Sequence, residues 1–209
     1  MAGRPSSAAD RSPGAPRVPA RERLLGAAAE LFYAHGVAAT GIETVIAEAG
    51  VARMSLYNNF ASKEELVLAH LRARHEEWLG LYRRRLAAAG DPAARVGAVF
   101  DAYVDHAEKA YRHGFRGCGL LNAAAELPTG SPGRELVRRH KEEVQALLEG
   151  HLLEAGLPPG TCTATAEHLS FLLEGAMARG GLEGDPQRLH HAREIAARLV
   201  GPLTAGTTA

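Results

Sequence analysis

The side chains best suited to specific hydrogen bonding lie close together in a short stretch, residues 52–59. This stretch contains an arginine, a serine, a tyrosine and two asparagines: Arg53, Ser55, Tyr57, Asn58 and Asn59. A guanidinium group donates two parallel hydrogen bonds to guanine, an asparagine amide pairs with adenine, and hydroxyl groups bind phosphate oxygens. These residue types therefore suit contact with nucleic acid, provided that the chain presents them on one exposed face.

Two predicted helices joined by a tight turn would present them in this way. A helix over 42–49 packs down through an apolar stripe at helical spacing, which consists of Ile42, Val45, Ile46 and Ala49. Gly50 permits a sharp turn, and Val51 and Leu56 bury the short second helix, 52–59, against the first. A helix-turn-helix unit reads DNA with its second helix in the major groove. Spacing alone leaves open an ordinary corner between two helices.

Helical spacing continues along the whole chain after residue 19. Two capping-box patterns, Thr40-Gly41-Ile42-Glu43 and Ser62-Lys63-Glu64-Glu65, predict helix N-termini. Proline and glycine clusters separate the later helices. The pattern predicts an all-α protein with about nine helices, over 20–35, 42–49, 52–59, 63–89, 92–113, 119–127, 132–155, 161–179 and 186–203.

Composition and charge narrow the class of protein. Residues 1–19 consist largely of Pro, Ser, Gly, Ala and Arg, which predicts a disordered arm. The whole chain has a formal net charge of zero, but residues 1–23 are basic, because five arginines face Asp10 and Glu22. There is no apolar run of bilayer length and no secretory signal, and the two cysteines are far apart. We expect a reduced, cytoplasmic protein without a membrane segment.

Enzyme motifs are missing from the sequence. It has no G-x-S-x-G, H-E-x-x-H, P-loop or C-x-x-C pattern, and its ten histidines are dispersed. We therefore expect no catalytic residues, no cofactor and no metal site.

Residues 21–66 resemble the N-terminal domain of the tetracycline-repressor (TetR) family. The matching residues are Ala28, Leu31-Phe32, Gly36, Thr40, Ile46-Ala47, Ala49-Gly50-Val51, Leu56-Tyr57, Phe60 and Ser62-Lys63-Glu64. The resemblance implies a homodimeric all-α transcription regulator. It implies a three-helix DNA-binding domain over 20–66 and a ligand-binding and dimerisation domain over 67–209.

The resemblance also assigns roles in DNA binding. Thr40 and Gly41 would contact phosphate, Tyr57 would lie against the DNA backbone, and Lys63 would hold a phosphate. The base edges would be read by Arg53, Ser55 and Asn58. Two positions depart from the family pattern. Ala52 replaces the usual small polar cap, and Met54 stands where a small residue is common and would touch a thymine methyl or hinder the usual approach.

The second domain is expected to hold an apolar pocket with a few polar groups. Its candidate lining residues are Trp78, Tyr82, Phe100, Tyr103, His106, Cys118, Leu121, Asn122 and Phe171. Taken singly, each of them is more typical of an ordinary core. Residues 115–127 resemble a motif of one branch of the family, in which Cys118, Asn122 and Glu126 recur every four residues. They would point into the pocket or fasten their helix to its neighbours. A redox role for Cys118 is a third reading.

The C-terminal helices are the candidate dimer interface. One apolar face consists of Leu169, Leu172, Leu173, Ala176 and Met177, and a second includes Ala192, Ala196 and Leu199. Two such helices from each subunit would form a four-helix bundle, as the resemblance implies, although a pairing within one chain is the alternative.

These features predict a ligand-responsive dimeric repressor. It would bind a palindromic double-stranded DNA operator and be released by a small-molecule effector, with the helix over 63–89 as the lever. One alternative is a helical small-molecule-binding protein or enzyme with an inactive DNA-binding head. Others are a transcriptional activator and a repressor that needs a corepressor.

Overall fold

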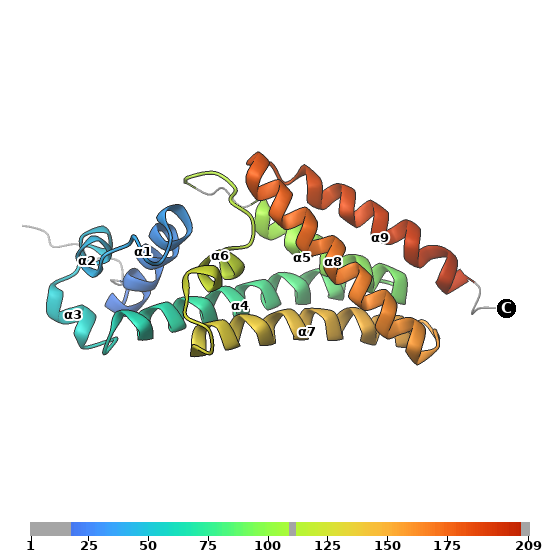
Figure 1. Ribbon diagram of the computed structural model, residues 1–209, viewed down its shortest axis with the longest axis horizontal. Coiled ribbons are helices and arrows are strands. Elements are labelled where there is room, and N and C mark those ends of the chain that lie inside the picture. The colour runs from blue at the N-terminus through green and yellow to red at the C-terminus, as the bar shows by residue number, and fades with distance from the viewer. Residues whose placement is uncertain (1–17, 109–111, 206–209) are drawn as a thin grey trace, which may run out of the picture.

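The computed structural model describes residues 18–108 and 112–205 and confirms the all-α class (Figure 1). The predicted arm lies almost entirely outside the described residues. Within them the chain forms nine helices and no strand: α1 (Ala20–His35), α2 (Ile42–Ala49), α3 (Arg53–Tyr57), α4 (Lys63–Ala87), α5 (Pro92–Ala107), α6 (Gly119–Glu126), α7 (Pro132–Glu154), α8 (Pro159–Glu183) and α9 (Gln187–Ala205).

Helices α1 to α3 form a small unit at one end of the molecule, here called the head (Figure 1). Helix α1 packs against both α2 and α3. Helix α3 has only five residues and is too short to be stable in isolation. Its Leu56 is fully buried, and Phe60 just after it is buried as well. Burial against α1 and α2 therefore holds α3 in place.

Helices α4 to α9 form the body. Helix α4 begins at the head and runs the length of the body beside α7 (Figure 1). Helix α5 packs against α4, α7 and α9, and α8 packs against α7 and α9. The short α6 contacts α1 of the head and α7 of the body. Every long helix of the body has an apolar face that is buried within this single chain. On α9 this face consists of Leu189, Ala192, Ala196 and Val200.

One of the two predicted capping boxes is correct. The Ser62 hydroxyl accepts a hydrogen bond from the Glu65 amide at 3.2 Å and caps α4. The prediction for Thr40 is wrong, because the N-cap of α2 is Gly41. The Thr40 hydroxyl instead donates to the Gly36 carbonyl at 2.7 Å. The Thr40 side chain therefore binds the carbonyl group that follows α1 and does not cap α2.

Several helix ends differ from the predicted ones. Helix α3 is shorter than 52–59, since Ala52 is extended (φ −71°, ψ 148°) and has no side chain to cap it. Helix α5 ends at Ala107, well before residue 113. Helix α8 is longer than predicted and ends where Gly184 adopts a left-handed conformation with φ 72°. The remaining ends agree to within two residues.

Four histidines are buried in the described part of the chain: His70, His106, His140 and His151. Burial lowers the pKa of His70 and of His140 to about 3, and that of His106 to about 4. Nearby cations add to this effect, namely Arg74 for His70 and His106, and Lys141 for His106 and His140. These three imidazoles are therefore neutral in the folded protein at neutral pH.

Acidification should destabilise the fold through these three histidines. In the unfolded chain they take up protons below a pH of about 6.5, whereas in the folded chain they resist protonation until about pH 4 or below. The free energy of unfolding should therefore fall as the pH is lowered from 6.5 to 4. Urea denaturation followed by circular dichroism at several pH values measures this slope.

Two variants separate the buried histidines from the exposed ones. His70→Gln should lose part of the pH dependence, while His191→Gln, at an exposed position, should keep the wild-type slope. A free energy of unfolding that stays constant between pH 6.5 and 4 in the wild-type protein would contradict the prediction.

Candidate functional site

Helix α3 presents its polar side chains to solvent, as the sequence predicts. Met54 is 66% exposed and Tyr57 46% exposed. Arg53 and Asn58 are exposed as well, whereas Ser55 is half-buried. The inward-facing Leu56 fixes this orientation, because the opposite face of so short a helix has to point outward. The exposed face thus carries a guanidinium, an amide, a phenol and a thioether.

The turn before α3 is held by a glycine and an arginine. Gly50 adopts a left-handed conformation (φ 58°, ψ 39°), as the predicted sharp turn requires. The Arg23 guanidinium of α1 donates a hydrogen bond of 2.6 Å to the Gly50 carbonyl. A side chain at position 50 would also meet this guanidinium, since an added Cβ lies 2.8 Å from Arg23 Nη2. The angle between α2 and α3 is therefore set from two sides.

Arg53 is held only weakly in the free protein. Its guanidinium lies 3.1 Å from a Glu43 carboxylate oxygen, and both side chains are about two-thirds exposed. Exposed ion pairs of this kind contribute about 0–1 kcal/mol. The guanidinium can therefore leave Glu43 for a stronger acceptor at little cost.

The residues around the start of α2 differ in their availability. Thr40 is only 4% exposed and its hydroxyl donates to carbonyl groups of the chain, which contradicts the expected hydroxyl contact with phosphate. Gly41 is exposed. The Lys63 ammonium lies 3.5 Å from the Ala38 carbonyl, beside the loop between α1 and α2.

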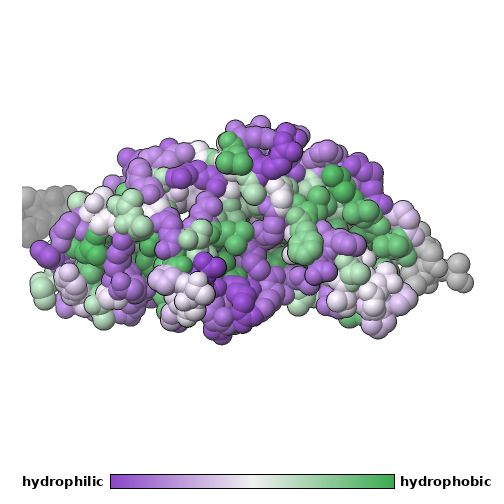
Figure 2. Space-filling view, in the orientation of Figure 1, coloured by the Kyte–Doolittle hydropathy of each residue, from purple (hydrophilic) through white to green (hydrophobic). Residues whose placement is uncertain are grey.

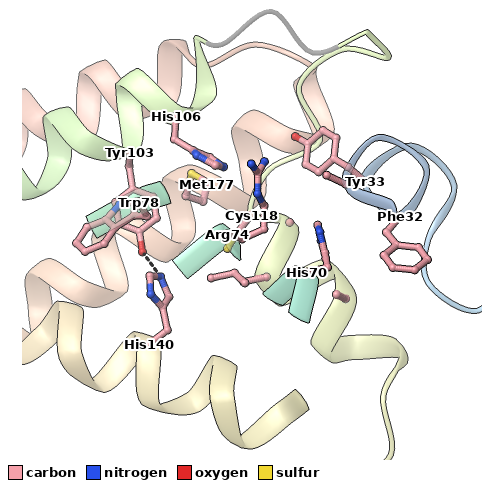
Figure 3. A pocket seen from close by; sticks show the side chains of 14 residues that line it. Phe32, Tyr33, His70, Arg74, Trp78, Tyr103, His106, Cys118, His140 and Met177 are labelled. Atoms are coloured by element: carbon pink, nitrogen blue, oxygen red, sulfur yellow. Dashed lines mark hydrogen bonds between the residues drawn. The ribbon is translucent and has the colours of Figure 1, made fainter. Parts of the chain in front are cut away.

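The body encloses a cavity of about 30 Å³ between α1, α4, α5, α6, α7 and α8 (Figure 3). Trp78, Tyr103 and His140 group at one side of it, and Phe32, Tyr33 and His70 at the other. The lining consists of Ala29, Phe32, Tyr33, His70, Arg74, Trp78, Tyr103, His106, Cys118, Gly119, Leu120, Ala123, His140 and Met177. In this conformation the space is far below the ~300–1,000 Å³ of a pocket for a drug-sized ligand.

Four of the nine predicted pocket residues line this cavity: Trp78, Tyr103, His106 and Cys118. The other five do not. Tyr82 and Phe100 are buried in the surrounding core. Leu121 and Asn122 are exposed and border a shallow surface groove. Phe171 is 64% exposed on α8. Helical periodicity identified these residues as apolar or polar, but not which side of each helix faces the interior.

The cavity also contains residues that the sequence analysis missed. His70, Arg74 and Trp78 are spaced four residues apart on α4 and share one face. Because Trp78 was a predicted pocket residue, this spacing would have predicted His70 and Arg74 as well. Tyr33 and His140 come from the more distant α1 and α7, and no local pattern marks them.

The polar groups at the cavity are tied into a network. His140 lies between two partners, with its Nε2 3.2 Å from the Tyr103 hydroxyl and its Nδ1 3.0 Å from Nδ1 of His75. Lys141 donates to the Tyr103 hydroxyl at 3.3 Å and pairs with Glu174 at 2.7 Å. Burial alone would lower the pKa of Lys141, but Cys118, Tyr103 and Glu174 raise it above its ordinary value. Lys141 is therefore a charged, paired ammonium.

The motif at residues 115–127 fastens α6 to its surroundings. Asn122 Nδ2 donates to the Arg116 carbonyl at 2.9 Å, and a Glu126 carboxylate oxygen accepts from the Ala38 amide at 2.6 Å. Of the three spaced residues, only Cys118 reaches the cavity. Both interpretations of the motif therefore apply in part. Cys118 lines the cavity, whereas Asn122 and Glu126 fasten α6 to its neighbours.

A second contact joins the head to the segment before α6. The Tyr33 hydroxyl accepts from the Arg116 amide at 2.6 Å and donates to the Gly117 carbonyl at 3.2 Å. The Arg116 guanidinium also donates to the Tyr33 carbonyl at 3.2 Å. Farther out, Arg112 pairs with Glu48 of α2 at 3.0 Å. Helix α6 and the preceding loop therefore bind the head by hydrogen bonds, in addition to the continuous helix α4.

The predicted dimer residues are mostly buried inside the single chain, which contradicts their proposed role. Leu169, Leu173, Ala176, Met177, Ala192 and Ala196 are buried, Leu172 is partly buried, and Leu199 is exposed. The large exposed apolar side chains of α8 and α9 are Phe171, Leu182, Leu203 and the predicted Leu199. The two helices use the predicted faces to pack on each other and on α5 and α7.

Within residues 18–108 and 112–205, no helix has the length and apolar character needed to cross a bilayer. No group of three histidine, cysteine, aspartate or glutamate side chains in these residues could hold a metal ion.

Family models match both parts of the chain. The model described as "Bacterial regulatory proteins, tetR family" matches residues 24–70. The model described as "Tetracyclin repressor-like, C-terminal domain" matches residues 92–196.

Individual relatives agree with these matches. The transcriptional activator FasR of Mycolicibacterium smegmatis is 34% identical over 112 residues, which cover 52% of this chain and 51% of FasR. The transcriptional repressor KstR2 of the same organism is 34% identical over 104 residues, covering 49% of this chain and 50% of KstR2. The chain thus spans about half the length of these curated relatives.

A solved structure extends the similarity over nearly the whole chain. A TetR-family transcriptional regulator from Streptomyces coelicolor superposes with a TM-score of 0.76 at 32% identity, covering 86% of this chain and 95% of that one. A regulatory protein from Rhodobacter sphaeroides superposes with a TM-score of 0.73 at 25% identity, covering 87% and 98%. With an exposed helix-turn-helix face, an enclosed cavity and matches to both family models, the chain belongs to the TetR family of bacterial regulatory proteins.

Proposed function

We propose that this protein is a transcriptional regulator that binds a palindromic DNA operator as a homodimer and responds to a small molecule. The exposed face of α3 carries the proposal, because a buried Leu56 forces Arg53, Tyr57 and Asn58 outward on the second helix of a helix-turn-helix unit. In this arrangement Arg53 and Asn58 read base edges, with Ser55 beside them, while Tyr57, Gly41 and Lys63 contact the phosphate backbone. Met54, at the centre of the face, contacts thymine methyl groups.

Replacement of Arg53 tests the DNA-binding face. Arg53→Ala should weaken binding to the duplex upstream of the protein's own gene by about 10- to 100-fold, the equivalent of about 1–3 kcal/mol for one bidentate base contact. Binding to an unrelated duplex of equal length should change far less. Fluorescence anisotropy with both labelled duplexes at one fixed salt concentration measures the difference.

Arg83→Ala is the matched control, since Arg83 is exposed on α4 in the body, and its loss changes the net charge equally. It should leave both affinities unchanged. Equal losses for Arg53→Ala on the specific and the unrelated duplex would reduce Arg53 to a phosphate contact. Failure of the wild-type protein to discriminate between the duplexes would contradict this choice of operator.

The dimer interface is proposed on the outer face of α8 and α9. Phe171 and Leu182 share one face of α8, and Leu199 and Leu203 are exposed on α9. Leu182 is 90% exposed, which is costly for a large apolar side chain in water. Hydrophobic residues gather along these two helices on the face shown in Figure 2. Pairing of these faces forms a four-helix bundle that holds two heads for successive major grooves.

A charge on this face should separate the subunits. Phe171→Asp places a carboxylate in the proposed interface and should shift the protein from dimer to monomer in sedimentation-velocity experiments at micromolar concentration. Leu153→Asp is the control, because Leu153 is a comparably exposed leucine on α7. A Phe171→Asp protein that remains dimeric would place the interface elsewhere.

The effector is proposed to act through α6. This helix contributes Gly119, Leu120 and Ala123 to the cavity wall, and its last residue, Glu126, holds the Ala38 amide of the head. A molecule that enlarges the cavity displaces α6 and changes the position of the head relative to the body. Coupling of this kind typically amounts to about 1–3 kcal/mol between the two binding sites. In this proposal the helix predicted as the lever, residues 63–89, acts together with the contact between Glu126 of α6 and Ala38 of the head.

Loss of the Glu126 carboxylate should loosen the head without unfolding the body. In Glu126→Ala the Ala38 amide loses its acceptor, so amide hydrogen exchange should accelerate in the loop between α1 and α2. Exchange in α5, α7 and α8 should remain as in the wild-type protein. Hydrogen exchange followed by mass spectrometry reports both regions at once.

Glu154→Ala is the control, since Glu154 is an exposed carboxylate that pairs with Arg95 and His151 in the body. It should leave the exchange of the head unchanged. Unchanged exchange at residues 37–41 in Glu126→Ala would exclude this hydrogen bond as a connection between head and body.

The direction of regulation is proposed to be repression, with release of the operator by the effector. The relatives include both an activator and a repressor. A promoter–reporter fusion decides between them, because deletion of a repressor raises transcription, whereas deletion of an activator lowers it.

A further inference from the structure

The lining residues of the cavity limit which kinds of ligand it can bind. We propose that the effector is a compact, uncharged aromatic compound with a hydrogen-bond acceptor, such as a carbonyl oxygen, that binds the indole N–H of Trp78. This inference rests on the proposed ligand-responsive function and names the ligand class for the same cavity.

The shape and composition of the lining favour a flat ring. The described lining includes the aromatic rings of Phe32, Tyr33, Trp78 and Tyr103, together with three imidazoles. The Trp78 and Tyr103 ring centroids lie 5.1 Å apart, and His140 stands edge-on to Trp78 at 5.4 Å. Aromatic pairs attract one another in such offset and edge-to-face arrangements. An aryl ring of a ligand can therefore join this group through the same kinds of contact.

The Trp78 indole N–H is a buried donor at the cavity that lacks an acceptor in the described part of the chain. Its side chain is 3% exposed, and its Nε1 atom has no hydrogen-bond acceptor among the residues that the structure describes. A buried donor without an acceptor costs about 1–3 kcal/mol. Trp78 lines the cavity, so a ligand that brings an acceptor to this N–H recovers that cost. A purely hydrocarbon ligand does not.

The charges around the cavity disfavour an anion. Arg74, which lines the cavity, pairs with Glu77, and the adjacent Lys141 pairs with Glu174. Burial keeps His70, His106 and His140 neutral, with a pKa of about 3 for His70 and His140 and about 4 for His106. The cations at this site thus already have carboxylate partners. A ligand carboxylate would be a buried charge in excess, which is costly to desolvate.

The size of the cavity limits the ligand and explains how it would act. A space of about 30 Å³ holds about two water molecules. A single-ring compound therefore has to displace part of the wall. The short helix α6 supplies the Gly119, Leu120 and Ala123 portion of that wall. Larger molecules would have to separate the long helices, whose packed cores resist such movement.

Three small molecules of nearly the same size test the proposal: acetophenone, ethylbenzene and benzoate. Acetophenone has the ring and a neutral acceptor, ethylbenzene has no acceptor, and benzoate has an acceptor with a negative charge. The chain contains a single tryptophan, so a ¹H–¹⁵N spectrum shows one indole resonance, which belongs to Trp78. Titrations of the full-length protein at pH 8 follow this resonance and the thermal unfolding midpoint.

Acetophenone should shift the indole proton downfield in a saturable manner and bind at least tenfold more tightly than either of the other two probes. Ethylbenzene should leave the indole resonance near its free position. Trp78→Phe removes the N–H and should reduce acetophenone binding, measured by thermal shift, to the level of ethylbenzene. Tyr82→Phe is the matched control, because the Tyr82 ring stacks on Trp78 while its hydroxyl binds His151, outside the cavity.

Three outcomes would overturn the proposal. One is tighter binding of benzoate than of acetophenone at pH 8, and another is an unshifted indole resonance in saturating acetophenone. The third is the same preference for acetophenone over ethylbenzene in Trp78→Phe. None of these measurements involves DNA, so they are independent of the duplex-binding experiment. A ligand-free wild-type protein that fails to bind any operator, yet binds acetophenone as expected, would refute the regulatory function and leave the ligand class standing.

Discussion

Helix α4 has to bury side chains beside both the head and the body, and this constraint organises the molecule. Its first turns place Leu66 and Val67 against the head, and its second half places Trp78, Leu79 and Tyr82 in the body. Its 25 residues form a rod roughly 37 Å long. Between these two sets of residues the same helix contributes His70 and Arg74 to the cavity lining. The cavity therefore lies where the head and the body share a wall.

The interior beside α4 is unusually polar for a helical core, and its composition is consistent with a binding role. Lys141 and Glu174 form a partly buried ion pair, and the Tyr103 hydroxyl contacts both Lys141 and the neutral imidazole of His140. An apolar core of similar volume would be at least as stable as such pairs. The stability of the fold therefore does not explain the polar groups at this site.

The connection between head and body is double. Helix α4 is a continuous covalent connection, whereas α6 and the loop before it bind the head through non-covalent contacts, among them hydrogen bonds at Arg116, Gly117 and Glu126. Hydrogen bonds at the protein surface break and reform at a cost of about 1 kcal/mol each, unlike a helix backbone. A displacement of α6 can therefore reposition the head while α4 stays intact.

The sequence by itself determined the helices and the helix-turn-helix corner, because these depend on neighbours within about four residues. Apolar spacing located α2 and α3, Gly50 marked the turn, and Ser62 capped α4. The outward face of α3 followed from the same spacing, since a helix with Leu56 inside must expose Arg53 and Tyr57.

Only the tertiary structure decided which apolar face meets which partner. Thr40 matched a capping pattern, yet the Gly36 carbonyl, brought close by the chain reversal, took its hydroxyl. Leu169 and Ala192 matched an interface, yet other helices of the same chain cover them. Trp78 was foreseen in the cavity, but Tyr33 and His140 join it from distant helices. The spacing of apolar residues predicts which face of a helix is apolar. Which other helix covers that face depends on contacts between residues far apart in the chain.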